Sequence, residues 1–384
     1  MTIDDVLTCI LRLPEVRAVG DGSQDVLVVL VRTDSGAVGI GEMHTAPTVG
    51  AAIIHAPISH VRSRGLASVL VGEDPLDIDG CWQLMADASE VYGRRGVAMH
   101  AISGVDLALW DLRGKLEGRS VSDMLGGRHR EVLRPYASVL MPETVEEAEI
   151  LAADCRDEGF TAVKYGWGGL GAGPDRARAL VSAVRSTDPR AELMIDVGAG
   201  LPFEAAIRLA ELLAPFRITF LEEPLHPDDL DGFARLREAS PIPIATGEKE
   251  TSLAGFRELI TRGRPHIVQP DLARAGGFTE VERIYELART HGIEVIPHCW
   301  STDILVAATC HFIASRPMQV PLEFCLADNA IRRNLATQPL RFRGDGVHVP
   351  AGPGLGIALD PDTIDHFAVQ SSHPLGEILE AIAM

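Results

Sequence analysis

Short apolar runs alternate with longer amphipathic stretches through the middle of the chain. Eight of these runs are four or five residues long and have the composition of buried β-strands. Most of the segments between them are long enough for a helix, and 204–213 and 279–290 have helical periodicity. Such alternation predicts a parallel sheet, and eight strands favour a closed barrel over an open sheet. The eight predicted strands are 136–140, 161–165, 193–197, 218–221, 242–245, 266–269, 293–297 and 320–324.

Two threonine–glutamate pairs have the spacing of a capping box. In that motif, a threonine and a glutamate three residues later each bind the other's backbone N–H at the start of a helix. Thr144 with Glu147 and Thr279 with Glu282 therefore predict two helix starts.

The two ends of the chain depart from the repeat. Residues 26–33 and 37–40 predict two strands joined by the turn Asp34-Ser35-Gly36, and long helical stretches follow. This beginning indicates a separate α+β domain. Near the other end, the turn cluster Pro353-Gly354-Leu355-Gly356 follows the eighth β-run and does not continue the repeat. We therefore expect the C-terminal segment to return to the first domain.

Composition and charge restrict the class of protein. Apolar residues make up 46% and charged residues 23%, which is typical of a globular protein, and the net charge of −19 makes nucleic acid an improbable partner. The apolar run 26–31 is far too short to cross a membrane, and Asp4, Asp5 and Arg12 interrupt any signal-peptide pattern. The six cysteines are scattered without paired spacing, so we expect a reducing, cytoplasmic compartment.

Polar residues recur where the predicted strands end. From Asp196 onward they stand 23 to 27 residues apart, which is about one β/α unit. One functional group is therefore expected at the C-terminal end of each successive strand, where barrel enzymes have their active sites. These residues are Lys164, Asp196, Glu222, Glu248, Asp271, His298 and Glu323.

Three of these residues predict a metal site. Asp196, Glu222 and Glu248 follow consecutive strands, so their carboxylates can converge, and converging carboxylates repel unless a cation neutralises them. Three oxygen ligands suit Mg²⁺, with water and substrate oxygens completing the shell. A single acid in such a place is more often solvated or paired with lysine, but three at this interval favour the metal.

The neighbouring residues suggest acid/base chemistry. Asp271 can hold one nitrogen of His298 and leave the other facing the cavity. Lys164 can contact a substrate carboxylate, or alternatively pair with Asp196. Tyr165 is expected on the opposite face of the strand from Lys164, and Gly166 on the same face.

Several short motifs accompany these residues along nearly the whole chain. Each is weak alone, but together they are specific. In this combination the chain resembles the enolase superfamily, in its mandelate racemase branch. The motifs are Gly41-Glu42, Ala101-Ile102-Ser103-Gly104-Val105-Asp106-Leu107-Ala108-Leu109-Trp110-Asp111, Leu221-Glu222-Glu223-Pro224, Gly247-Glu248, Gln269-Pro270-Asp271, Ile296-Pro297-His298 and Pro353-Gly354-Leu355-Gly356.

The resemblance implies an α/β fold in which an α+β capping domain covers a modified TIM barrel, (β/α)₇β. We expect residues 1–130 to form the capping domain, 131–335 the barrel, and 336–384 a segment that returns to the cap. The resemblance also implies a homo-oligomer and Mg²⁺ held by the three carboxylates. The shared first step would be removal of the proton α to a substrate carboxylate, giving an enolate stabilised by the metal.

Details of the resemblance bear on the reaction. Asp271 stands where the muconate-cycloisomerase branch has lysine, which favours the branch with a His/Asp pair, and Glu323 matches a carboxylate that hydrogen-bonds substrate oxygen. The branch commonly has Lys-x-Lys on the second strand, but this chain has Lys164-Tyr165-Gly166. The usual Asp-x-Asn at the first ligand is here Asp196-Val197-Gly198.

With one clear base, dehydration is the simplest chemistry. We expect a hydro-lyase that converts an aldonate or aldarate to a 2-keto-3-deoxy acid, with His298, Asp271 and Lys164 as catalytic residues. Alternatives are a racemase or epimerase that uses Lys164 with His298, a sugar-lactone cycloisomerase, and a non-catalytic barrel protein.

Substrate specificity is expected from loops of the first domain near 17–24 and 43–48, which would close over the barrel mouth. The substrate is expected to be a small carboxylate. The candidate substrate-binding residues are Glu323, Tyr165, Trp167, Arg17 and His44.

Overall fold

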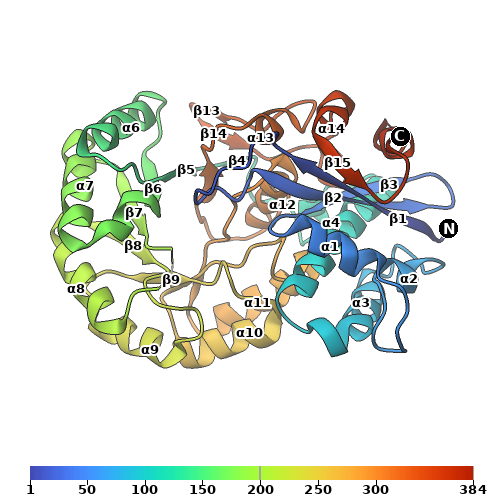
Figure 1. Ribbon diagram of the computed structural model, residues 1–384, viewed down its shortest axis with the longest axis horizontal. Helices are drawn as coiled ribbons and strands as arrows, with labels where there is room; N and C mark the ends of the chain where they lie inside the picture. The colour runs from blue at the N-terminus through green and yellow to red at the C-terminus, as the bar shows by residue number, and fades with distance from the viewer. Residues whose placement is uncertain (199, 384) are drawn as a thin grey trace.

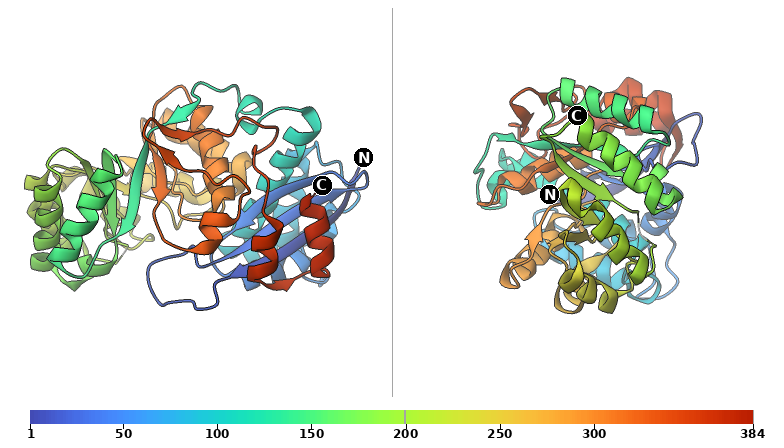
Figure 2. Two further views of the ribbon diagram at one scale, coloured as in Figure 1. Left: turned by 90° about the horizontal axis from the view of Figure 1, so that it is seen from above. Right: turned by 90° about the vertical axis from the view of Figure 1, so that its left-hand side faces the viewer.

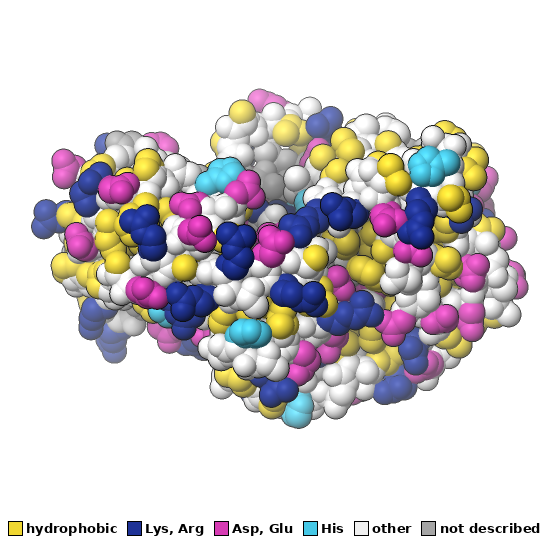
Figure 3. Space-filling view, turned by 90° about the horizontal axis from the view of Figure 1, so that it is seen from below, with side chains coloured by type: hydrophobic (Ala, Val, Ile, Leu, Met, Phe, Trp, Pro, Cys, Tyr) yellow, Lys and Arg dark blue, Asp and Glu magenta, His cyan; other side chains and the backbone are white. Residues whose placement is uncertain are grey.

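A ring of strands and helices lies beside a smaller α+β domain (Figure 1). The computed structural model describes residues 1–198 and 200–383. In this part of the chain, no helix combines the length and apolarity needed to cross a membrane. Over the face drawn in Figure 3, Lys and Arg side chains are interspersed with Asp and Glu.

The ring is an eight-stranded parallel sheet in the order β11-β10-β9-β8-β7-β6-β5-β12. All eight predicted strands form. Seven helices alternate with them and cover the outside of the ring (Figure 1). The strands are β5 (Pro135–Leu140), β6 (Ala162–Gly166), β7 (Glu192–Asp196), β8 (Ile218–Glu222), β9 (Ile244–Thr246), β10 (Ile267–Val268), β11 (Glu294–Val295) and β12 (Leu322–Cys325). The helices are α6 (Val145–Asp157), α7 (Pro174–Thr187), α8 (Phe203–Leu213), α9 (Leu230–Ala239), α10 (Ser252–Glu258), α11 (Gly277–Thr290) and α12 (Asp303–Ala314).

The ring differs from a fully closed barrel at one seam. Within the described residues, β11 and β12 end the strand order without a ladder between them. Residues 296–302 are not part of a strand, although the Ile296 N–H still donates to the Val268 carbonyl oxygen of β10 at 3.1 Å. The carboxylate of Glu323 accepts a 2.7 Å hydrogen bond from the backbone N–H of Cys299, so a side chain joins the two edges.

The barrel helices follow from their apolar spacing. In α8, the buried residues Ala206, Leu209, Ala210 and Leu213 recur at helical intervals, so one face packs on the sheet. The capping box at the start of α6 is confirmed, since Thr144 and Glu147 bind each other's backbone N–H.

The second predicted capping box is wrong. Helix α11 begins at Gly277, so Thr279 lies inside its first turn. The Thr279 hydroxyl donates a 2.6 Å hydrogen bond to Asp106, which lies 173 residues earlier in the chain. This tertiary contact uses the group that a capping box would require.

The capping domain contains an antiparallel sheet in the order β15-β1-β2-β3. The C-terminal strand β15 pairs with β1, and the C-terminal helices lie beside the N-terminal strands (Figure 2). The strands are β1 (Ile3–Arg12), β2 (Asp25–Thr33), β3 (Val38–Met43) and β15 (Ala368–Ser371). The helices are α1 (Pro47–His55), α2 (Ala67–Leu70), α3 (Ile78–Gly93), α4 (Val97–Glu117), α5 (Val121–Met124), α14 (Pro361–Phe367) and α15 (Leu375–Ala383).

The central strand β2 is buried on both faces, which explains its uninterrupted apolar run. Val26, Val28 and Leu30 belong to a core that includes side chains of α14 and α15. Leu27 and Val29 belong to a second core with α1, α3 and α4. The remaining elements connect barrel and cap: β4 (Val132–Leu133) pairs with β14 (Gly346–His348), which pairs with β13 (Phe342–Arg343), and α13 (Ala330–Asn334) precedes them.

Helix α4 joins the two ends of the chain through Asp111. Its carboxylate accepts hydrogen bonds from the backbone N–H of Ile40 at 2.8 Å and of Leu355 at 2.7 Å. A Cβ atom at Gly41 would stand 2.1 Å from the Gly104 carbonyl oxygen, so only glycine allows β3 to approach α4 this closely. These motif residues therefore hold the cap together.

Replacing Asp111 with asparagine tests this role. An Asp111→Asn side chain has one acceptor oxygen where two backbone donors need one each, so one buried N–H loses its partner. The free energy of unfolding should fall by about 1–3 kcal/mol, measured by urea denaturation. The exposed Asp365→Asn is the matched control. Equal stability of the two variants would contradict this role.

Candidate active site

A cavity of about 490 Å³ lies where the barrel meets the capping domain. The capping domain contributes His100 from α4, Thr45, and residues 19–22 of the loop that follows β1. The loops expected to cover the barrel mouth thus do reach it. The barrel contributes charged and aromatic residues from the ends of its strands, among them Lys164, Trp167, Asp196, Glu248, Lys249, Arg274, His298, Trp300 and Glu323.

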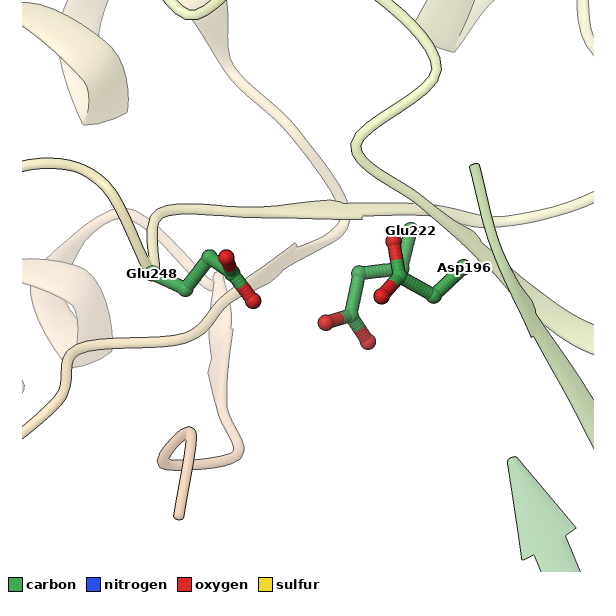
Figure 4. Close-up of side chains that lie close together, drawn as sticks. All are labelled: Asp196, Glu222 and Glu248. Atoms are coloured by element: carbon green, nitrogen blue, oxygen red, sulfur yellow. The ribbon is translucent and has the colours of Figure 1, made fainter. Parts of the chain in front are cut away.

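Asp196, Glu222 and Glu248 converge beside this cavity. Asp196 ends β7, Glu222 ends β8, and Glu248 follows β9. Each is buried, and each offers an oxygen within 4.8 Å of the other two (Figure 4). Hydrogen bonds orient two of them: Gly198 N–H donates to Asp196 at 2.8 Å, and the Gln269 amide donates to Glu222 at 2.7 Å.

The charge of this cluster is incompletely compensated. Burial raises the pKa of Asp196 to about 7, against the opposing effect of the Lys164 ammonium. Burial likewise raises the pKa of Glu222 to about 8, again opposed by Lys164. The donor set therefore fits a divalent cation, because three hard oxygen ligands are available and their mutual repulsion would be relieved.

Lys164 is held between two carboxylates. Its ammonium lies 2.8 Å from Glu222 Oε1 and 2.7 Å from Glu323 Oε1, rather than pairing with Asp196 as one alternative supposed. Burial would lower the pKa of Lys164, but these two carboxylates hold it well above its usual value. Lys164 is thus a fixed positive charge and not a free base.

His298 and Asp271 form a hydrogen-bonded pair. His298 Nδ1 lies 2.6 Å from Asp271 Oδ2, and Nε2 lies 3.2 Å from Glu248 Oε2. Burial would lower the pKa of His298, but Glu248, Glu323 and Asp271 raise it to about 9. The sequence-based pairing of these two residues agrees with this geometry, and Nε2 is the nitrogen available to the cavity.

Glu323 lines the cavity as an ionised carboxylate. Burial would raise its pKa, but Lys164 and His298 lower it overall. Besides Lys164, it accepts hydrogen bonds from the Ser138 hydroxyl and from Cys299 N–H, each at 2.7 Å. Glu323 is therefore an acceptor with a fixed orientation.

Trp167 also lines the cavity, and its ring lies beside Gly198, one of the two departures from the family pattern. A Cβ atom at Gly198 would lie 2.8 Å from this ring, so the ring fills the space next to position 198. The Lys249 ammonium stands 5.2 Å from the ring centroid. Gly166 is closely packed too, since a Cβ atom there would lie 2.9 Å from an Asp196 oxygen.

The structure does not place the other three candidate substrate-binding residues in the cavity. Tyr165 points outward into the layer between strand and helices, as strand alternation requires. Arg17 is exposed, and its backbone rather than its side chain makes the bonds to Gln24. His44 is fully buried and binds Asp271 at 3.0 Å.

The lining residues that were not expected individually from the sequence include Asp21, His100, Lys249, Arg274 and Trp300. A usable signal existed for two of them, because Lys249 directly follows Glu248 and Arg274 lies three residues after Asp271. The others depend on contacts between distant segments. Trp300 Nε1–H, for example, donates to Asp21 across the mouth at 3.1 Å.

Comparison with known proteins agrees with this arrangement. The family profile "Mandelate racemase / muconate lactonizing enzyme, N-terminal domain" matches residues 6–126, and "Enolase C-terminal domain-like" matches 146–363. The chain belongs to the mandelate racemase/muconate lactonizing enzyme family. The resemblance to the enolase superfamily is thereby confirmed, and the protein is an enzyme of that superfamily.

Three relatives with named activities align over most of their length. A D-galactarolactone cycloisomerase of Agrobacterium fabrum is 34% identical over 89% of this chain and 90% of its own. An L-rhamnonate dehydratase of Saccharopolyspora erythraea is 34% identical over 94% of this chain and 90% of its own. The crystal structure of the 3,6-anhydro-D-galactonate cycloisomerase from Zobellia galactanivorans has a TM-score of 0.87 at 31% identity, covering 96% of this chain and 100% of that one.

The raised pKa values predict how pH acts on the metal site. Without a cation, Asp196 and Glu222 bind protons more tightly in the folded than in the unfolded chain. Their contribution to stability is therefore complete at low pH and is lost as the pH rises through about 7 to 8. The melting temperature of the metal-free protein should fall over this range, and Mg²⁺ should raise it more at the upper end.

Because the ligands must lose protons, Mg²⁺ binding near neutral pH should release on the order of one proton. Titration calorimetry in buffers of different ionisation enthalpy measures this number. Asp196→Asn is the control, and it should abolish both the binding and the proton release. Binding without proton release would show that the three carboxyls are already ionised.

Proposed function

We propose that this enzyme is a hydro-lyase that removes water from an acid sugar, an aldonate or aldarate, to give a 2-keto-3-deoxy acid. The observation that carries the proposal is His298, whose ring is oriented by Asp271, in the same cavity as the immobilised Lys164. The names of the relatives, which act on rhamnonate, galactarolactone and anhydrogalactonate, support a substrate of the acid-sugar class.

Asp196, Glu222 and Glu248 would hold a divalent cation. A bound Mg²⁺ supplies positive charge that favours enolate formation from a carboxylate. Lys164 adds a second fixed positive charge, held by Glu222 and Glu323. Since burial in the cavity strengthens such interactions, the residues are arranged in advance for the negative charge that develops when the α-proton leaves.

His298 would act twice. A cation held by Glu248, the group that raises the pKa of His298 most, would favour the neutral ring. Its Nε2 would then take the proton from the α-carbon, and the electrons of the C–H bond form the enolate. The imidazolium, stabilised by Asp271 at Nδ1, then gives a proton to the β-hydroxyl, which leaves as water when the C–O bond breaks. The resulting enol tautomerises to the 2-keto acid, so hydrogen and oxygen balance with the loss of one water.

A two-base racemase is less well supported. Position 166, where the family commonly has its second lysine, is glycine, and Lys164 is held in two ion pairs. Tyr165 points away from the cavity into the layer under the helices. One-sided proton transfer by His298 fits elimination better than inversion.

A lactone cycloisomerase is the second candidate, and the relatives with this activity favour it. The chemistry is closely related. If the β-oxygen belongs to the ring of a lactone, the same proton removal breaks the same C–O bond, but the leaving oxygen stays attached to the molecule. The product then has the mass of the substrate.

The experiment is a mass-spectrometric screen of mono- and diacid sugars and their lactones, incubated with the protein and Mg²⁺ in D₂O. Loss of one water from an acid is expected and would identify the substrate. Conversion of a lactone to a keto acid without loss of water, at a mass changed only by solvent deuterium, would establish the cycloisomerase instead. Deuterium uptake without elimination would indicate a racemase or epimerase, and no reaction with any acid or lactone would contradict both candidates.

Replacing His298 tests its role as the base. In His298→Asn, turnover and α-proton exchange should both fall by about 10²–10⁴-fold, because the amide cannot accept the proton. Exchange is measured by NMR in D₂O. The exposed His348→Asn should keep wild-type rates. Retained exchange in His298→Asn would assign proton removal to another residue.

A further inference from the structure

His44 follows strand β3 of the capping domain and is buried directly behind the His298–Asp271 pair. Its side chain has no exposed surface, and it does not line the cavity. Instead its Nε2 lies 3.0 Å from Asp271 Oδ2, the same oxygen that His298 Nδ1 approaches at 2.6 Å. The two imidazole centroids are 6.4 Å apart with nearly parallel planes, at 26°. One carboxylate oxygen of the barrel thus serves a histidine from each domain.

The protonation of His44 follows from its partners. Arg274 Nη2 stands 3.3 Å from His44 Nδ1, and a guanidinium can only donate. Nδ1 must therefore accept, and Nε2 carries the hydrogen that His44 donates to Asp271. Burial, with the Arg274 guanidinium, lowers the pKa of His44, which is consistent with a neutral ring.

This arrangement fixes the Asp271 carboxylate on both oxygens. Oδ1 accepts from the backbone N–H of Ala273 at 2.7 Å, and Oδ2 accepts from the two histidines. Burial would raise the pKa of Asp271, but His44, His298 and Arg274 hold it well below its usual value. A carboxylate held by these bonds fixes the direction from which His298 Nδ1 approaches, so the imidazole ring has a defined orientation, with Nε2 directed toward Glu248 and the cavity.

We propose that His44 is a positioning residue, through which the capping domain orients the His298–Asp271 pair and so completes the base. The inference rests on the proposed function, since it takes His298 to be the base. From the sequence, His44 is expected to be a substrate-binding residue. The geometry instead assigns it a role behind the reacting groups, comparable to the outer partners that orient catalytic histidines elsewhere.

If His44 only stabilised the fold, its replacement would have different effects. His311 in α12 is an equally buried histidine, with Nδ1 near the Ser122 hydroxyl and Nε2 near the Leu355 carbonyl oxygen. It is therefore the matched control for the loss of a buried, hydrogen-bonded imidazole. If His44 only filled the domain interface, His44 and His311 variants would differ in nothing but stability.

The first test is spectroscopic and needs no substrate. In the Mg²⁺-loaded full chain, the low-field ¹H resonance of His298 Nδ1–H is assigned by its loss in His298→Asn. His44→Leu should shift or broaden this resonance. His44→Gln, whose amide can donate from nearly the position of Nε2, should restore it, and His311→Leu should leave it unchanged. An unchanged resonance in His44→Leu would overturn the proposal.

Should His44→Leu fail to fold, His44→Asn replaces it. The asparagine amide is equally polar but too short to reach Asp271, so comparison with His44→Gln isolates the donated hydrogen bond. Equal spectra for the two amide variants would also overturn the proposal.

The second test uses whichever acid sugar or lactone the screen identifies. In His44→Leu, kcat should fall about 10–100-fold while KM stays near the wild-type value, because His44 does not touch the cavity. His44→Gln should recover most of kcat. A change in KM alone would return His44 to substrate binding. If the wild-type protein exchanges no acid, the proposed function fails, and the spectroscopic test still decides whether His44 positions His298.

Discussion

Burying several carboxylates in one cavity is the constraint on which the site depends. An isolated buried carboxylate is too costly to remain ionised, so each one requires a partner. Glu222 and Glu323 share the Lys164 ammonium, and Asp271 has its two histidines. In the cluster of Asp196, Glu222 and Glu248, burial raises the pKa values of Asp196 and Glu222, so full ionisation of the three carboxyl groups requires a further positive charge. This requirement marks the place for a cation.

This compensation requires both domains. The barrel alone supplies His298 and Asp271, but the capping domain supplies His44, which donates to Asp271. A second contact between the domains is made by Glu42, whose carboxylate accepts a hydrogen bond from the Thr302 hydroxyl at the start of α12. Asp111 fixes the strand from which these residues extend. Packing of the cap therefore supports the chemistry of the barrel, although within the described residues the three clustered carboxylates all come from the barrel.

Local patterns made much of this predictable. The eight strands were found because apolar runs recur with the β/α repeat, and the polar residues at their ends were found because strand ends in a barrel share one rim. The capping box at Thr144 needed only neighbouring residues. Predictions failed where distant segments compete. Thr279 gives its hydroxyl to Asp106, and His44 contacts a residue 227 positions away.

Two further features differ from what was expected from the sequence. They are the seam between β11 and β12 and the outward direction of Tyr165. Strand β11 ends at Val295, before His298, and makes no ladder with β12, which no run of apolar residues reveals. Side chains alternate along a strand, so Tyr165 points away from the face that carries Lys164. The expectation that Tyr165 binds substrate therefore disagreed with this alternation.

The packing of Trp167 against Gly198 links two positions that lie on different strands' loops. Gly198 has a φ of +73° and no room for a Cβ atom beside the Trp167 ring. An asparagine side chain at 198 would clash with the Trp167 ring in its present position. The shape of this part of the pocket wall therefore depends on positions 167 and 198 together, because any side chain at 198 would require the Trp167 ring to move.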